Sequence, residues 1–447
     1  MKGLLFTYAL TYGGAVVSLF NPWYGLLIYI CFATVRPDSL WFWSVPVGNY
    51  SRIVAMGLLV GWGLHGFGNW SFGRARPIVY ALLAFWAWSI LCGVFADNSA
   101  AAWGFVESKS KIFLPFLVGA TLIDSLDRVK QLAWVLVLSQ GYVAYDLNMA
   151  YCDGFNRLME AGFGGMDNNC VSISMVAGVG LAFFLGIAES LWWRKLLAFA
   201  AAALMTHVPM FGMSRGGMLG LIVTGVVAFW LIPKEPKQYA VFALAVVVAL
   251  SLAGPPVVAR FATVFASKEE RDQSAQSRLE QWRDCWRAML DHPVVGVGPD
   301  NWVSAQRNYG WSRGADGRPV GLEAHSLWFT TGAEMGFPGI GFLLAFYGFA
   351  VLRPWRAIQD GFFTDFWATH LARMTIASIA GFCTAVSFVS LEGLEFPYYV
   401  VLIGCGVLML ACEEPRAEDG ARRTENGGRR TEGGSRRAEV GPLTTDN

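Results

Sequence analysis

Apolar runs long enough to cross a lipid bilayer constrain this chain more than any other feature. They lie at about residues 3–20, 22–36, 51–70, 77–95, 112–124, 131–150, 169–189, 195–213, 216–232, 238–254, 327–352, 371–391 and 396–412. A helix crosses the hydrocarbon with about 20 apolar residues, because its backbone polar groups must bond within the same segment. We therefore predict an all-α polytopic integral membrane protein with about 12–13 transmembrane helices. No small-residue cleavage site follows the first run, so we expect that helix to be uncleaved.

The composition agrees with a membrane protein and excludes several other classes. Of the 447 residues, 55% are hydrophobic and 15% are charged, and the formal net charge is +1. Soluble domains are about 45–50% apolar and about 25% charged. These values argue against a soluble enzyme and a disordered scaffold. The near-zero net charge offers no basic surface, so we expect no nucleic-acid partner.

Lysine and arginine in the short loops predict the orientation of the spans. Five pairs fall on one side of the predicted membrane: Arg74 and Arg76, Arg128 and Lys130, Arg194 and Lys195, Lys234 and Lys237, and Arg353 and Arg356. Cytoplasmic loops carry the excess of such residues. Segments 96–111, 151–168, 213–216, 254–326 and 392–396 are then expected on the opposite, periplasmic side. Thirteen spans would also put the N-terminus there, so one of the first runs could be re-entrant.

Three regions follow from this pattern. Residues 1–150 form an N-terminal transmembrane region, and residues 151–412 form a second one that includes a large, partly helical periplasmic loop at 254–326. Residues 413–447 carry a Gly-Arg-Arg-rich repeat of seven residues without an apolar face, which predicts a disordered cytoplasmic tail. Cys152 and Cys285 both fall in periplasmic segments; they could pair, and two free thiols are equally consistent with the spacing.

The large loop carries the densest set of motifs. Residues 274–290 have helical periodicity, with one apolar stripe beside Arg278, and His292-Pro293 followed by Gly296-Val-Gly298 ends the helix in a turn. The stripe consists of Leu279, Trp282, Trp286, Met289 and Leu290. A helix lying on the membrane surface would explain the tryptophans but not an arginine beside the stripe.

Two further motifs lie at predicted membrane boundaries. Ser214-Arg215-Gly216 separates two apolar runs; Arg215 either snorkels to the interface or binds an anion. His325-Ser326 precedes the next run, and nine residues later comes Gly336-Phe-Pro-Gly-Ile-Gly341. A histidine at a helix start is often structural, but its near-neutral pKa makes His325 the side chain in this motif that could take a proton from a hydroxyl.

Weaker candidates lie on the same side of the predicted membrane. Lys109 and Lys111 stand where segment 96–111 re-enters the membrane, and Asn168 lies in the triplet that begins the span at 169. Snorkelling and helix capping are the ordinary roles of such residues. Cations and a base next to hydrocarbon nevertheless suit a lipid-linked phosphate donor and a hydroxyl acceptor. The sequence has no acidic ligand cluster and no zinc or haem spacing, so we expect neither a metal nor another cofactor.

The three motifs together resemble the O-antigen ligase and polymerase superfamily. The resemblance is carried by Ser214-Arg215-Gly216, by Arg278-x-x-x-Trp282 running into His292-Pro293, and by His325-Ser326 with its glycine motif, and it covers about residues 160–412. Near the N-terminus, Arg36-Pro37-Asp38 resembles the branch of O-glycosylation ligases associated with exosortase A. The N-terminal half otherwise departs from better-known ligases, which leaves the acceptor open.

The resemblance implies a glycosyltransferase of the bacterial inner membrane. Its donor would be an undecaprenyl-diphosphate-linked glycan, and its acceptor a hydroxyl of a glycan, lipid or protein at the periplasmic face. Arg215 and Arg278 would engage the diphosphate and His325 would assist the acceptor. We expect Lys109, Lys111, Asn168, Ser214, Trp282 and Ser326 to help bind the substrates.

Two other functions stay open at this point. A polymerase of lipid-linked repeat units would use the same three motifs, and the N-terminal resemblance favours a ligase over it. A transporter or flippase of an anionic lipid-linked substrate would also use arginines. Transporters usually have internal repeats and polar sites at the midplane of the bilayer. This sequence shows no clear pairing of halves, and its polar motifs gather at one face.

Overall fold

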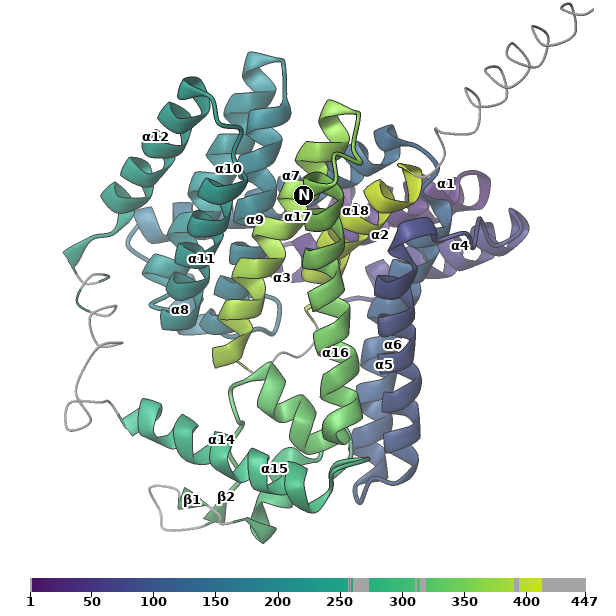
Figure 1. The fold of residues 1–447 in the computed structure, drawn as a ribbon, viewed down its shortest axis with the longest axis vertical. Coiled ribbons are helices and arrows are strands. Elements are labelled where there is room, and N and C mark those ends of the chain that lie inside the picture. Colours follow the sequence, from purple (N-terminus) through teal and green to yellow (C-terminus); the bar gives the residue numbers. More distant parts are fainter. Residues whose placement is uncertain are drawn as a thin grey trace, which may run out of the picture.

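The computed structural model is almost entirely helical (Figure 1), and it describes residues 2–255, 257, 259, 273–309, 312–313, 319–389 and 394–411. The predicted tail at 413–447 and residues 260–272 of the large loop lie outside the described residues. The all-α polytopic fold class is confirmed.

The N-terminal half forms helices that follow the apolar runs. Their bounds are α1 Lys2–Phe20, α2 Pro22–Val35, α3 Pro37–Leu40, α4 Tyr50–Leu64, η1 Gly73–Ala75, α5 Arg76–Val94, α6 Ser99–Leu122, α7 Leu126–Cys152 and α8 Arg157–Ala161. Proline begins α2 and α3, where its missing N–H group costs no helical hydrogen bond.

The second half continues the bundle and contains the large loop. Its helices are α9 Asn168–Ala188, α10 Trp192–Phe211, α11 Arg215–Leu231, α12 Pro236–Leu252, α14 Gln273–Asp291, α15 Trp302–Ala305, η3 Gln306–Asn308, α16 Leu327–Gln359, α17 Phe366–Ala385, η4 Val386–Phe388 and α18 Phe396–Leu410. Two short strands, β1 Ser312–Arg313 and β2 Pro319–Val320, pair antiparallel.

Each predicted apolar run coincides with a helix. Among the described residues, five helices are long and apolar enough to cross a membrane: Gly3–Phe20, Gly73–Val94, Asn168–Ala188, Leu327–Gln359 and Phe366–Phe388. Shorter apolar helices lie at Tyr50–Leu64, Arg215–Leu231, Pro236–Leu252 and Phe396–Leu410. The multi-pass architecture is therefore confirmed, while the number of spans stays a prediction.

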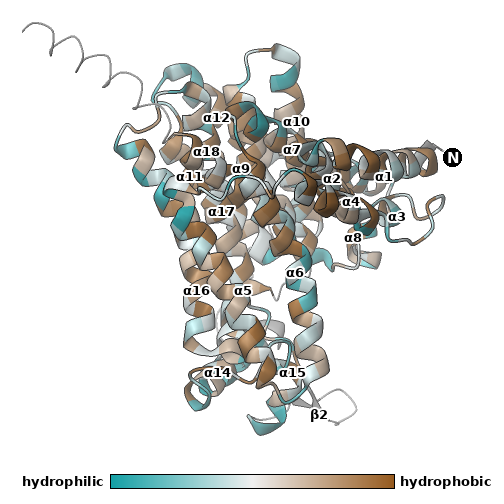
Figure 2. Cartoon of the chain, turned by 90° about the vertical axis from the view of Figure 1, so that its right-hand side faces the viewer, coloured by the Kyte–Doolittle hydropathy of each residue, from teal (hydrophilic) through white to brown (hydrophobic). Residues whose placement is uncertain are grey.

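The core of the bundle is built around α9, α17 and α18. α9 packs against α10, α11 and α17, and α18 packs against α7 and α17. Both α9 and α18 are buried along almost their whole length. This burial explains why they are apolar on every face, whereas a helix at a surface facing water would carry one polar side. Hydrophobic residues also predominate on α2 and α4 (Figure 2).

One end of the molecule is formed by a loop module. We use this name for α14, α15, the two strands and the part of α16 that precedes Gly336. The module lies beside the ends of α5 and α6 (Figures 1 and 2). α6 begins at Ser99, so most of segment 96–111, which we expected to lie outside the membrane span, continues the same helix.

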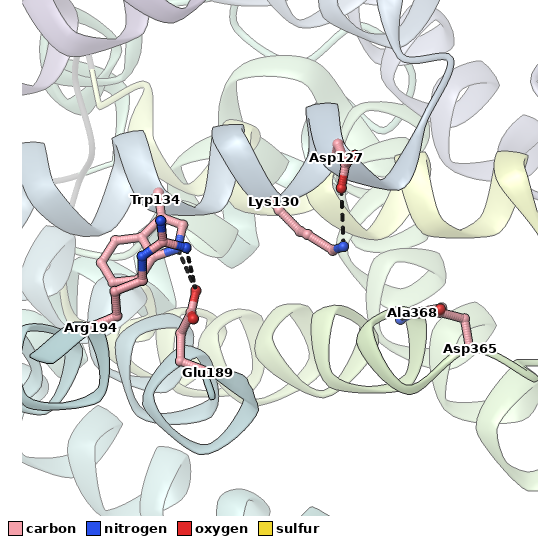
Figure 3. Close-up of polar contacts among 7 residues, drawn as sticks. All are labelled: Asp127, Lys130, Trp134, Glu189, Arg194, Asp365 and Ala368. Carbon is pink, nitrogen blue, oxygen red and sulfur yellow. Dashed lines mark hydrogen bonds and ion pairs between the residues drawn. The ribbon is translucent and has the colours of Figure 1, made fainter. Parts of the chain in front are cut away.

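The opposite end gathers the basic pairs that predicted the orientation. Figure 3 shows Trp134 donating to Glu189 at 2.9 Å, with Arg194 3.8 Å from the same carboxylate. Nearby on α7, Lys130 pairs with Asp127 at 3.1 Å (Figure 3).

Contacts between other loops place further basic groups at this end. The Lys130 ammonium lies 5.0 Å from the ring centre of Trp367, at the start of α17. Arg353 donates to the carbonyl of Arg74 at 3.4 Å. The clustering agrees with the predicted alternation of spans, and the assignment of this end to the cytoplasm remains a prediction.

The two cysteines considered for a disulfide are both free. Cys152 is exposed at the end of α7, and Cys285 is buried in α14. Burial raises the pKa of the Cys285 thiol, which keeps it protonated and unreactive.

Candidate functional site

Ser214 fixes the start of α11 and therefore the position from which the Arg215 side chain extends. Its hydroxyl accepts from the Gly217 N–H group at 3.2 Å and donates to Asn169 Oδ1 at 3.0 Å. Ser214 is fully buried, and Arg215 is the first, partly exposed residue of the helix. Ser214, predicted to bind substrate, is thus engaged as a helix cap that positions Arg215.

The start of α9 lies directly beside the start of α11. Asp167 caps α9 by accepting from the Cys170 N–H group at 2.8 Å, and its second oxygen accepts from Asn169 Nδ2 at 3.2 Å. Asn168 donates to the carbonyl of Gly212 at 2.8 Å, in the turn before α11. Two helix N-termini are thereby tied together. The start of α9 already holds the Asp167 carboxylate, whereas the partial positive charge at the start of α11 favours an anion next to Arg215.

Arg36, from the N-terminal motif, reaches the turn that leads into α9. Its guanidinium donates to the carbonyl of Gly164. The backbone of Arg36 adopts a left-handed conformation, with φ 45°, between α2 and α3. The Arg36-Pro37-Asp38 motif therefore supports the turn before Asp167, which sequence reasoning did not predict.

His325 is presented by a strained backbone immediately before α16. Its φ is 47°, a value unusual for a residue other than glycine. Trp282 of α14 donates its indole N–H group to the carbonyl of Ala324 at 2.9 Å. The indole also stacks on Phe329, with ring centres 5.2 Å apart. Trp282, predicted to bind substrate, thus holds the residue next to His325 in place.

Charged groups from two different elements act on the His325 imidazole. The side chain is accessible at the surface, yet its partial burial lowers the pKa of His325, and the positive charge of Arg278 lowers it further. The carboxylate of Asp167 acts in the opposite direction and raises the pKa. Arg278 belongs to α14 and Asp167 to the start of α9, so the imidazole lies within electrostatic range of both elements.

A short helical turn, η4, connects the two halves of the site. Phe388 lies 6.1 Å from Trp282, measured between ring centres. A methyl group placed on Gly216 would lie 3.1 Å from the Cβ atom of Phe388. Ser387 accepts from the indole of Trp328 at 3.0 Å. The starts of α11 and α16 and the middle of α14 therefore converge on η4, which the sequence identified only as part of an apolar run.

Ser326 lies beside His325 and is fully buried at the start of α16. Its hydroxyl makes no hydrogen bond within the described parts of the chain. A buried hydroxyl without a partner is costly, so a polar group supplied by another molecule would be favoured there. This placement is consistent with the predicted role of Ser326 in binding.

The two predicted lysines of α6 lie in different surroundings. Lys109 is buried and lines a cavity of about 50 Å³ together with Asp300, Glu323 and Glu334. Thr330 and Leu327 also line this cavity, which places it beside the first turn after His325. Lys111 lies on an exposed part of α6 and pairs with Glu107 at 2.7 Å. The lysines therefore do not contribute to one common surface.

The glycine motifs interlock to form the frame of the loop module. The carbonyl of Pro293 accepts from the Phe337 N–H group, and the carbonyl of Glu334 accepts from Gly298, each at 2.9 Å. Gly336 has φ 66° and ψ −170°, a conformation that essentially only glycine adopts. The turn at 293–298 and the bend at Gly336 thus fold against each other.

An amide clamp fixes this frame to the tip of the α5–α6 hairpin. The Asn98 N–H group donates to Asn301 Oδ1 at 2.8 Å, and Asn301 Nδ2 donates to the carbonyl of Asn98 at 3.2 Å. On the same side, Trp88 of α5 donates its indole N–H group to the carbonyl of Met335 at 2.9 Å. The position of His325 relative to the bundle therefore depends on contacts between residues that are more than 200 positions apart in sequence.

Comparison with known proteins gives two matches. Residues 200–344 match the model of the O-antigen ligase family, a region that contains Arg215, Arg278 and His325. An O-antigen ligase of Pseudomonas aeruginosa is 24% identical over 233 residues. That alignment covers 50% of this chain and 54% of the relative, so the chain spans about half the length of the curated relative that it matches. Both matches confirm the predicted resemblance to the O-antigen ligase superfamily.

Proposed function

We propose that this protein transfers a glycan from an undecaprenyl-diphosphate-linked donor to a hydroxyl group of a lipid or protein acceptor. The reaction would take place at the periplasmic face of the bacterial inner membrane. The family resemblance supports glycosyl transfer at a membrane. The residues around η4 supply the chemical argument for the donor and for the individual roles.

The observation that carries the proposal is the convergence of cationic groups and one base. Arg215 stands at the start of α11, beside the start of α9, so a guanidinium and the N-terminus of α11 can act on one anion. Arg278 acts electrostatically on His325 from α14. Trp282 and Phe388 link these two groups of residues. An anionic leaving group and a hydroxyl nucleophile need this combination.

The chemistry is a substitution at the anomeric carbon of the donor sugar. The acceptor oxygen forms a bond to that carbon, while the bond from the carbon to the diphosphate oxygen breaks and its electron pair leaves with the diphosphate. His325 takes the proton of the attacking hydroxyl, which is typically worth about 10²–10⁴-fold in rate. Arg215 and Arg278 neutralise the charge that develops on the diphosphate, because a guanidinium can bind two phosphate oxygens at once. We assign this neutralisation to the arginines and to no metal.

The remaining predicted residues have different roles under this proposal. Ser214 and Trp282 position Arg215 and His325, through the helix cap and the bond to Ala324. Lys109 and Ser326 flank the acceptor side, because one lines the cavity beside the first turn of α16 and the other begins that turn. Asn168 holds the α9 and α11 starts together. Lys111, paired with Glu107, would contribute least.

The proposal favours a ligase of the exosortase-associated branch over a polymerase. Arg36 supports the turn before Asp167, so the N-terminal motif is connected to the site rather than remote from it. A polymerase would use the same arginines and the same base. The two activities differ in the intermediate that accumulates when the enzyme is absent.

The test is complementation of a deletion strain, followed by analysis of lipid-linked glycans and of surface glycans. Deletion should accumulate full-length lipid-linked chains; accumulation of single repeat units would identify a polymerase instead. His325→Ala and Arg215→Lys should both fail to restore transfer, because one lacks the base and the other lacks the bidentate fork.

The matched controls are His65→Ala and Arg353→Lys. Both residues are outside the site, at the end of α4 and near the end of α16, and both variants should restore transfer. Membrane levels of all four variants are compared by immunoblotting. Wild-type transfer by His325→Ala at equal protein level would contradict the assigned role, and it would also be the outcome expected of a transporter.

A further inference from the structure

The side chains on the outward face of α14 are sorted by chemical type around the helix. Leu279, Trp286 and Leu290 are 44%, 47% and 55% exposed, and they lie within about 40° of one another around a helix of about 3.6 residues per turn. Arg283 and Arg287, both exposed, follow next around the helix. The acidic residues come last in the same direction: Glu280, Asp291 and Asp284. Hydrophobic, cationic and anionic side chains thus occupy three successive strips.

The inner half of α14 is already occupied by the protein. Gln281, Cys285 and Ala288 are almost completely buried in the loop module. Met289 contacts the backbone of α16 at Gly332. The apolar stripe predicted from the sequence is therefore divided, with Met289 and the partly buried Trp282 facing the protein and the other three members facing outward. Burial within the protein does not explain those three members.

The exposed hydrophobic strip continues onto a helix that is apolar enough to span a membrane. Trp286 packs edge-on against Phe337, with ring centres 6.1 Å apart. Phe337 is 42% exposed and opens the second part of α16, within the candidate span Leu327–Gln359. Val294, which is 56% exposed, follows the end of α14 in sequence, and its carbonyl lies next to Gly336, the residue before Phe337. The exposed apolar surface of this candidate span thus continues onto α14 through the contact of Phe337 with Trp286.

We infer that α14 lies in the interface of the bilayer leaflet next to the loop module and that its partner is an anionic phospholipid surface. The strip of Leu279, Trp286 and Leu290 enters the boundary between headgroups and acyl chains. Arg283 and Arg287 meet the lipid phosphates, and the acidic strip faces water. Interfacial helices bury their apolar face about 5–10 Å into this boundary and gain affinity from anionic lipids.

One contact within the helix competes with the lipid phosphates. Arg287 pairs with Asp284 at 3.4 Å. The Arg287 side chain is 59% exposed, so a lipid phosphate can share its guanidinium with Asp284. Arg283 lies one turn from Leu279 and Trp286 and is closest to the hydrophobic strip, so its guanidinium is the stronger candidate for a headgroup contact.

The inference does not rest on the proposed reaction. It would hold for a ligase, a polymerase or a transporter, because it concerns only how the loop module meets the membrane. Its consequence for the site is geometric. Arg278 and Trp282 belong to the same helix, so a leaflet that holds α14 also fixes the depth at which His325 works.

The test compares two positions on the outward face of α14. An environment-sensitive fluorescent amino acid is incorporated at Leu290 or at Glu280, and the full-length protein is reconstituted into vesicles of phosphatidylcholine with a minority of phosphatidylglycerol. Spin-labelled phosphatidylcholine should quench the probe at 290 several-fold more than the probe at 280. Both side chains are exposed, so neither replacement disturbs the packed face of the helix.

Equal quenching at the two positions, or no quenching at 290, would overturn the inference. A probe at Leu279 repeats the measurement at the other end of the hydrophobic strip. It should be quenched as strongly as the probe at 290. Arg283→Gln should weaken the dependence of quenching at 290 on phosphatidylglycerol. Quenching at 290 that does not depend on phosphatidylglycerol in the unmutated protein would contradict the headgroup contact.

Discussion

At the scale of single residues, a few side chains act by holding others in position. Trp282 is the clearest case, because its indole N–H group is bonded to the carbonyl of Ala324 and its ring is stacked on Phe329. A substrate could contact only the part of the Trp282 ring that Phe329 does not cover. The placement of His325 therefore depends on Trp282, which the sequence presents as one of several tryptophans of the loop.

Trp282→Phe separates the hydrogen bond from the stacking. Phenylalanine keeps the aromatic contacts with Phe329 and Phe388 and loses the bond to Ala324. A hydrogen bond of this kind is worth about 0.5–1.5 kcal/mol, so we expect transfer to fall about twofold to tenfold. The measurement is the initial rate of transfer in vesicles at equal protein. Trp193→Phe, at the opposite end of the bundle, is the matched control; equal rates for the two variants would contradict the positioning role.

The pH dependence of transfer gives a second prediction at this scale. A general base must be neutral, so the rate falls as His325 becomes protonated at low pH. The charged groups identified around it are Arg278, which lowers the pKa of His325, and Asp167, which raises it. Removing the charge of Asp167 lowers that pKa and should move the acidic limb of the pH–rate profile to lower pH.

Asp167→Asn is the suitable change, because asparagine caps a helix about as well as aspartate. The profile is measured from initial rates, with Asp127→Asn as the control at the other end of the molecule. An acidic limb that stays in place, or that moves to higher pH, would show that Asp167 does not act on His325. Equal melting temperatures of the two variants would show that the cap is intact.

At the scale of elements, the bend in α16 organises the site. Gly336 joins two helical parts, and its backbone conformation brings the turn at 293–298 against the first part. The first part carries the residues that follow His325, whereas the second belongs to the bundle. The bend therefore sets the angle between the loop module and the membrane helices.

Gly336→Ala should disrupt this bend. The conformation alone costs a residue with a side chain about 1–3 kcal/mol, and the added methyl group would lie 2.3 Å from the carbonyl oxygen of Val294. We expect a lower melting temperature in detergent and loss of transfer. Gly341→Ala is the control five residues further on, where a methyl group meets no atom of the described residues within 4 Å.

The control should be neutral or slightly stabilising, because alanine favours a helix interior by about 0.5–1 kcal/mol over glycine. Equal stability of Gly336→Ala and Gly341→Ala would mean that the bend is not needed. Loss of transfer with an unchanged melting temperature would place the effect in the orientation of the loop module rather than in the stability of the bundle.

At the scale of the whole molecule, polar groups divide between two ends. The basic pairs of the short loops gather at the end where Arg194 and Glu189 meet, and the loop module lies at the other. If the first end is cytoplasmic, the charge distribution follows the usual bias of membrane proteins. The site around His325 would then face the periplasm, where the acceptor is expected.

Thiol labelling tests this orientation. Glu280→Cys and Lys237→Cys each add a thiol at an exposed position of one end. The background carries Cys152→Ser, which removes the thiol that is exposed among the described residues, and Cys412→Ser, at a position outside them. In cells with a permeabilised outer membrane, an impermeant reagent should label position 280. Position 237 should react only after the inner membrane is opened. The reverse pattern would invert the molecule and move the site to the cytoplasm.

The sequence by itself determined the fold class and supplied the principal candidates for the site. Every apolar run became a helix, because a run of that length has no other way to satisfy its backbone in hydrocarbon. Arg215, Arg278 and His325 were found as charged or titratable groups in a chain with few of them. Local patterns also predicted the helix ending at Asp291 and the turn after it.

Only the tertiary structure decided which candidates belong together. Lys109 and Lys111 are two residues apart, yet one faces a buried cavity and the other an exposed ion pair, because they point to different sides of one helix. Phe388 carries no motif and gains its importance from lying between Trp282 and Gly216. Contacts between segments this distant in sequence depend on how helices pack, and helix packing is set by complementary side-chain shapes that a single sequence does not display.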